Sequence, residues 1–91
     1  MPGHAAALEA LACVSVARGD SSEAARLLGA AQAWRQRRHR PANRLDRADA
    51  ERAEQAARAF LGDSEFDEVY RAGAARPEAV LDDADQVPAR R

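Results

Sequence analysis

The side chains of this sequence best suited to metal binding are two histidines and one cysteine. His4 and His39 are far apart in the sequence, and Cys13 lies between them. Zinc sites collect about four ligands, usually in pairs a few residues apart, so this spacing does not resemble a zinc site. Cys13 also falls on a packing face of the first expected helix, where a thiol is buried and unreactive. We therefore expect no metal site and no nucleophilic cysteine.

The carboxylates offer no catalytic arrangement either. Asp82, Asp83 and Asp85 cluster near the end of the chain, but they lack the glycine turn and the spaced glutamate of a calcium loop. Every other Asp and Glu falls on an expected exposed helix face or at a helix end, and none is isolated within an apolar pattern. The sequence therefore predicts no catalytic residue, no cofactor and no enzyme.

The basic residues are all arginine, because the sequence contains 14 of them and no lysine. Without lysine, the chain has neither the phosphate-binding lysine of a P-loop nor a Schiff-base lysine. Residues 35–58 hold eight arginines and four acids, whereas residues 59–91 hold four arginines and eight acids. Two explanations stay open at this point: ion pairing within the molecule, or a charged surface for a partner.

The densest basic run follows Trp34, and tryptophan and arginine are enriched where protein interfaces gain most binding energy. The candidate partner surface consists of Trp34, Arg35, Arg37, Arg38 and Arg40. Alternatively, Trp34 covers the following linker and the start of the third helix, and the arginines form a solvated helix end that suits the helix dipole. Direct binding to nucleic-acid phosphates is a further alternative, although the net charge is only −1 and no second aromatic residue interleaves the run.

Helices must position these residues, because the apolar spacing predicts four or five helices and no strand. The first helix is apolar on two faces, which predicts neighbours on both. Gly19 ends this helix, Asp20 caps the next, and Glu23 is placed to complete a capping box. The helix that follows Gly62 is expected to end near Gly73. The short turn at Gly19 makes the first two helices antiparallel.

The chain divides into four parts. Residues 1–38 form a helix pair, and residues 39–45 form a linker, because Pro41 disfavours helix before it. Residues 46–86 form the C-terminal capping helices, and residues 87–91 form a disordered tail. Alanine supplies 24 of the 42 hydrophobic residues, so only 18 larger ones remain for a core, and the alanines are expected at close helix crossings.

The helix pair shows the pattern of a tetratricopeptide repeat, a helix–turn–helix unit of about 34 residues. Seven residues occupy its signature positions: Leu8, Leu11, Ala12, Gly19, Ala24, Leu28 and Ala31. Ser15 and Gln36 depart from it, where such repeats carry tyrosine and proline. The predicted fold class is all-α, built from antiparallel helix hairpins that form the end of a tetratricopeptide-like solenoid of four to five helices.

The chain is also similar, over about residues 6–85, to the C-terminal region of bacterial NTPase-type transcriptional regulators of the LuxR and SARP (AfsR) families. The shared features are a GD turn at 19–20, an ARLLGAAxAxR helix at 25–35, an LG helix end at 61–62, Phe66 with Tyr70 before a glycine, and EAV at 78–80. The resemblance implies an interaction module that is a fragment or remnant of such a regulator. Its partner would be a separate protein or the preceding repeats. The NTPase activity is not implied, because the chain has no GxxxxGK[ST] loop.

Cysteine usage and hydropathy indicate the compartment. One cysteine cannot form an internal disulfide, which excludes a disulfide scaffold and favours a reducing cytoplasm. Glu9 interrupts the apolar N-terminal stretch, which has no basic segment before it, so it does not resemble a signal peptide. No apolar run approaches the roughly 18 residues of a membrane span. We expect a cytoplasmic protein with no membrane partner, for which self-association stays open.

Overall fold

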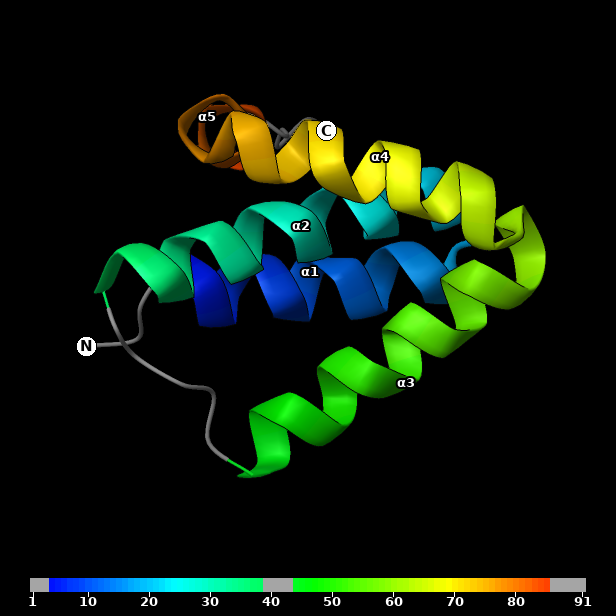
Figure 1. Ribbon diagram of the computed structural model, residues 1–91. Helices are drawn as coiled ribbons and strands as arrows, with labels where there is room; N and C mark the ends of the chain where they lie inside the picture. Colours follow the sequence, from blue (N-terminus) through cyan, green and yellow to red (C-terminus); the bar gives the residue numbers. More distant parts are fainter. Residues whose placement is uncertain (1–3, 39–43, 86–91) are drawn as a thin grey trace.

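The computed structural model describes residues 4–38 and 44–85, which fold into five helices (Figure 1). These are α1 (His4–Ala17), α2 (Ser21–Arg38), α3 (Arg44–Leu61), α4 (Asp63–Ala75) and α5 (Pro77–Asp85). The described residues contain no strand, so the predicted all-α class is confirmed for them. Helix α3 begins at Arg44, two residues before the predicted start of the C-terminal helices at residue 46. The predicted tail at 87–91 lies outside the described residues.

Helix α2 lies at the centre of the molecule and contacts all four other helices. Helix α1 runs antiparallel along one side of α2, and α4 packs along another side (Figure 1). Helix α3 crosses obliquely against both α1 and α2, and α5 contacts the same α2. An apolar side chain on α2 therefore meets a neighbour in almost every direction, which explains why this helix holds more of the buried residues than any other described helix.

The turn between α1 and α2 forms for the reasons read from the sequence. Gly19 has a φ of 83°, a conformation that costs glycine little. The side chain of Asp20 accepts a hydrogen bond of 3.0 Å from the Glu23 backbone N–H, so the predicted cap is confirmed. The predicted capping box is wrong, because Glu23 instead accepts hydrogen bonds from Arg26 and the Asp20 N–H donates to the Ser15 carbonyl.

Two glycines bring α2 and α4 together. A Cβ atom added to Gly29 would overlap the backbone carbonyl of Tyr70, and one added to Gly73 would overlap the carbonyl of Arg26. The two backbones are therefore closer than any side chain at these positions would allow. Gly73 lies inside α4, which continues to Ala75, two residues past the predicted end near Gly73. Its role is to make room for α2.

The core is built mostly from alanine, with few large residues. Leu8 and Phe66 are fully buried, and Phe66 lies beside Tyr70 with ring centroids 5.6 Å apart. From residue 47 onward, where its side chains are described, α3 contributes only Ala53 and Ala57 to the buried set. Small side chains let helices approach closely but bury little area each, so backbone proximity does much of the work that leucine and isoleucine do in larger cores. No described helix is long and apolar enough to cross a membrane.

Candidate interaction surface

Helix α1 presents an apolar surface outward. Its inward side is buried and includes Ala5, Leu8 and Ala12. On the opposite side, Leu11 is 37% exposed and Val14 is 50% exposed. We call this side the outer face of α1, and it consists of Ala7, Ala10, Leu11, Val14 and Ala17, all exposed.

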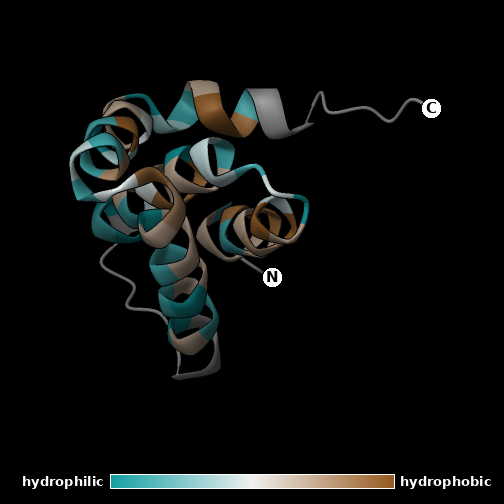
Figure 2. Ribbon diagram, turned by 90° about the vertical axis from the view of Figure 1, so that its right-hand side faces the viewer, coloured by the Kyte–Doolittle hydropathy of each residue, from teal (hydrophilic) through white to brown (hydrophobic). Residues whose placement is uncertain are grey.

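At 3.6 residues per turn, these five residues share an arc of about 120° on the helix. Figure 2 shows α1 at the edge of the molecule beside the N label, with its hydrophobic residues in brown. A helix that is apolar on all sides normally has neighbours on all sides. Among the described residues, the other large exposed apolar side chain is Phe60, on α3.

Of the seven predicted signature residues, six lie between the helices or in the turn, and one faces outward. Five of them are buried between the helices: Leu8, Ala12, Ala24, Leu28 and Ala31. Gly19 lies in the turn with its positive φ. Leu11 differs from the others, because it belongs to the outer face of α1 and does not contribute to the core of this molecule.

The inward side of α1 carries its only carboxylate. Arg35 on α2 donates two hydrogen bonds to Glu9, of 3.0 Å from Nε and 2.6 Å from a terminal nitrogen. The Arg35 side chain is only 14% exposed and that of Glu9 only 11%. Arg35 was predicted to belong to a partner surface; in the structure its guanidinium faces inward and binds Glu9 on α1.

Trp34 joins the ends of three helices. Its indole N–H donates a 3.3 Å hydrogen bond to the Pro77 carbonyl at the start of α5. The His4 ring, at the start of α1, meets Trp34 edge-on with centroids 4.9 Å apart. The Arg37 guanidinium lies 5.2 Å from the Trp34 ring centroid. Trp34 is therefore half-buried by contacts on α1 and α5, which were not predicted from the sequence.

The exposed Arg37 has an intramolecular partner. It donates a 2.6 Å hydrogen bond to Glu78 on α5, and both side chains remain largely in solvent. This hydrogen bond is the main cause that lowers the pKa of the Glu78 carboxyl below its ordinary value. Two further residues of the predicted partner surface lie outside the described residues: the side chain of Arg38 and the whole of Arg40.

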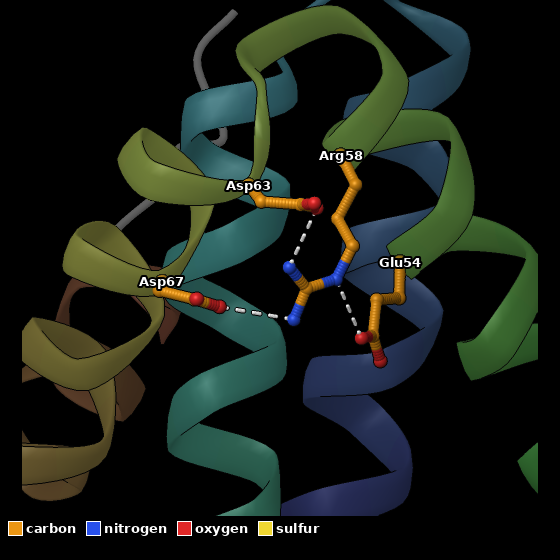
Figure 3. A network of polar contacts seen from close by, with 4 residues as sticks. All are labelled: Glu54, Arg58, Asp63 and Asp67. Atoms are coloured by element: carbon orange, nitrogen blue, oxygen red, sulfur yellow. Dashed lines mark hydrogen bonds and ion pairs between the residues drawn. The ribbon is translucent and has the colours of Figure 1, made fainter.

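A second charge cluster ties α3 to α4 (Figure 3). Arg58 donates hydrogen bonds to Glu54 at 2.9 Å, to Asp63 at 3.0 Å and to Asp67 at 3.0 Å. These hydrogen bonds, that with Glu54 first, raise the pKa of the guanidinium. The same group lies 4.2 Å from the ring centroid of Phe66. One planar cation thus holds carboxylates from both sides of the α3–α4 corner.

These pairs account for part of the charge asymmetry in the sequence. Four arginines of the basic middle bind carboxylates of the same chain: Arg35, Arg37, Arg52 and Arg58. Two of the four bind carboxylates in the acidic C-terminal part. At Arg37 and Arg58, ion pairs between the basic middle and the acidic part therefore connect helices, whereas Arg52 pairs with Asp49 within α3.

An open pocket of about 330 Å³ lies between α1 and α3 and is lined by Cys13, Val16, Asp49, Arg52 and Ala53. The Cys13 thiol points toward the backbone carbonyl of Asp49, 3.7 Å away. Burial, and next the charge of Asp49, raise the pKa of this thiol. A raised pKa lowers the fraction of reactive thiolate at neutral pH. The described residues contain no group of His, Cys, Asp and Glu that could hold a metal ion.

Two features of this surface were missed in the sequence. Gly29 sits inside a helical pattern, and only its buried alanine neighbours indicated that another backbone passes there. Glu9 is the only carboxylate in a helix that contains no arginine, which was the available sign that it had an internal partner.

Comparison with known proteins finds no matching family model, no matching curated protein and no matching solved structure.

Proposed function

We propose that this chain is a non-catalytic, helical protein–protein interaction module that forms the end of a tetratricopeptide-like solenoid. The observation that carries the proposal is the outer face of α1, which exposes Leu11 and Val14 in a helix with no charged residue on that side. In a helical repeat array, each repeat buries its remaining apolar face against the next one. The outer face of α1 is a surface of that kind.

The two ends of the molecule differ in the way that an end repeat requires. The exposed residues of α4 and α5 include six charged ones: Asp63, Glu65, Glu68, Arg71, Glu78 and Asp82. A terminal repeat needs such a polar outer surface to remain soluble, whereas its other side must join its neighbour. A polar end at α4 and α5 and an apolar end at α1 give the module a direction, with the preceding helices joining at α1.

The occupant we propose for the outer face is an apolar helix of a preceding repeat, in the same polypeptide or in a partner protein. The alanines at positions 7, 10 and 17 would let that helix approach closely, and Leu11 with Val14 would fill the space between them. A place in the C-terminal region of a LuxR- or SARP-type transcriptional regulator is proposed from the sequence resemblance alone. A cytoplasmic location is proposed from the single cysteine, which cannot form an internal disulfide.

Direct binding to nucleic acid is the less favoured alternative. It relied on the arginines of the basic middle, and Arg35 and Arg37 are engaged with Glu9 and Glu78. An arginine that already pairs with a carboxylate gains less from a phosphate, because the first ion pair must be broken.

A fusion tests the proposal. One consensus tetratricopeptide hairpin is joined ahead of residue 4, and thermal unfolding of the helices contributed by this chain is followed with and without it. Because neighbouring repeats stabilise one another, we expect a higher melting temperature in the fusion. The double variant Leu11→Asp/Val14→Asp should remove the gain. A matched pair on the polar end, Ala72→Asp/Ala79→Asp, should leave it intact. The proposal fails if the fused hairpin gives no gain to the unsubstituted chain.

A further inference from the structure

The rotational setting of α1 decides which of its faces a partner meets. We propose that Glu9 and Arg35 are the residues that set it, turning Leu11 and Val14 outward. The inference rests on the proposed function for its meaning, because the positioned surface is the outer face of α1. It concerns this chain alone, however, so it can be tested without any partner.

Burial of apolar area does not by itself choose the setting. The inner side of α1 offers Leu8 and two alanines, with Cys13 and Val16 also packed against the core, and the outer face offers Leu11 and Val14 with its own alanines. Because hydrophobic stabilisation is non-directional and proportional to area, turning either side toward α2 would gain similar free energy. An interaction with a direction is needed to distinguish the two.

The Glu9–Arg35 pair supplies that direction. It joins residues 26 positions apart in the sequence, through two hydrogen bonds between planar groups. A rotation that carried Leu11 inward would carry Glu9 away from α2, breaking both hydrogen bonds and separating two largely desolvated charges. Separating such a pair is costly, even where the pair adds little net stability compared with apolar residues. A single buried polar contact of this kind can specify the register of helices.

The position of the pair along α1 suits this role. Glu9 lies ten residues before Gly19, which corresponds to about 15 Å along a helix. The turn at Gly19 and Asp20 holds the end of α1, where the Asp20 N–H donates a 2.8 Å hydrogen bond to Ser15. Arg35 holds α1 near its middle. A second attachment away from the turn restricts the rotation of α1 more than the turn does by itself, and the edge-on contact of His4 with Trp34 adds a third at the start of the helix.

The test measures the solvent exposure of methyl groups in the intact chain by NMR. A soluble paramagnetic chelate relaxes exposed methyls faster than buried ones, so the Leu11 methyls should relax several-fold faster than those of the fully buried Leu8. In the variant Glu9→Leu/Arg35→Met, which keeps apolar volume at both positions, we expect the ratio of Leu11 to Leu8 relaxation to fall toward about one as two settings become populated.

Rescue and a matched control separate this role from general stability. The exchanged pair Glu9→Arg/Arg35→Glu should restore the ratio, because the same two groups face each other. Removing the exposed ion pair by Arg37→Ala/Glu78→Ala should leave the ratio at its original value.

An unchanged ratio in a helical Glu9→Leu/Arg35→Met protein would overturn the inference while leaving the proposed function intact. If that protein loses its helical circular dichroism, Glu9→Gln is measured instead, and an unchanged ratio there has the same meaning. A ratio that falls as expected supports the inference, even if a fused repeat fails to stabilise the chain and so overturns the proposed function.

Discussion

The Arg35 guanidinium donates two hydrogen bonds, of 2.6 and 3.0 Å, to the Glu9 carboxylate beneath the surface of an alanine-rich bundle. As a result, α1 turns its only carboxylate inward and leaves Leu11 and Val14 facing out. This is the reverse of an ordinary surface helix, whose charged side faces solvent. The arrangement is consistent with a helix that has a second neighbour.

Removing one partner of the pair should be costly. We expect Glu9→Ala to lower the free energy of unfolding by about 3 kcal/mol, toward the lower end of the range for buried pairs, because the two side chains keep 11% and 14% exposure. The double variant Glu9→Leu/Arg35→Met should have a free energy of unfolding close to that of the unsubstituted protein, since it leaves no unpaired buried charge. Urea denaturation measures both, and equal losses in the single and double variants would contradict the ion-pair explanation.

The contact between α2 and α4 predicts an inverted glycine effect. Alanine in place of an interior helical glycine normally stabilises by about 1 kcal/mol. Gly29→Ala should instead destabilise by about 2 kcal/mol or more, because its Cβ would overlap the Tyr70 carbonyl. At the exposed Ala72 of α4, the reverse change Ala72→Gly should cost only the helix-propensity difference. A Gly29→Ala protein that melts higher than the original would show that the two helices are farther apart.

Helix periodicity and turn chemistry were sufficient to predict the helices, because both are local. The spacing of Leu8, Ala12, Ala24 and Leu28 correctly marks inner faces, and Asp20 caps α2 as expected. The glycine crossing was not predictable in this way, because nothing near Gly29 in the sequence specifies which backbone passes it.

The inward Arg35 was missed for a different reason. Hydropathy places arginine in solvent, and its partner lies 26 residues away, on another helix. Leu11 fits the repeat pattern by residue type, but only the packed molecule shows that it faces out. Contacts between distant residues depend on how the helices pack, which a single sequence does not state.

The pH dependence of Glu78 follows from its hydrogen bond with Arg37. The pKa of Glu78 is lowered in the folded protein, so the contact stabilises the fold above the ordinary glutamate pKa and is lost as the pH falls through the lowered one. In an NMR titration, Arg37→Gln should raise the Glu78 pKa toward its ordinary value. If Glu78 titrates identically in both proteins, the hydrogen bond with Arg37 is not what lowers its pKa.

Cys13 should behave as a protected thiol. Burial and the nearby Asp49 raise its pKa, so the reactive thiolate forms only at higher pH than in an unfolded chain. We expect iodoacetamide to alkylate the native protein more slowly than the urea-unfolded protein, and the rise of the rate with pH to be shifted upward. Equal rates in the two states at neutral pH would mean that the thiol is neither shielded nor perturbed.

The most direct test of the interaction module is whether a preceding repeat covers the outer face of α1. In the fusion with a consensus hairpin ahead of residue 4, paramagnetic relaxation of the Leu11 and Val14 methyls by a soluble chelate is compared with that in the chain alone. The account predicts that both methyls become as protected as those of Leu8, and that Leu11→Asp/Val14→Asp abolishes the stabilisation by the hairpin. If Leu11 and Val14 relax equally fast with and without the hairpin, the outer face is not a repeat-docking surface.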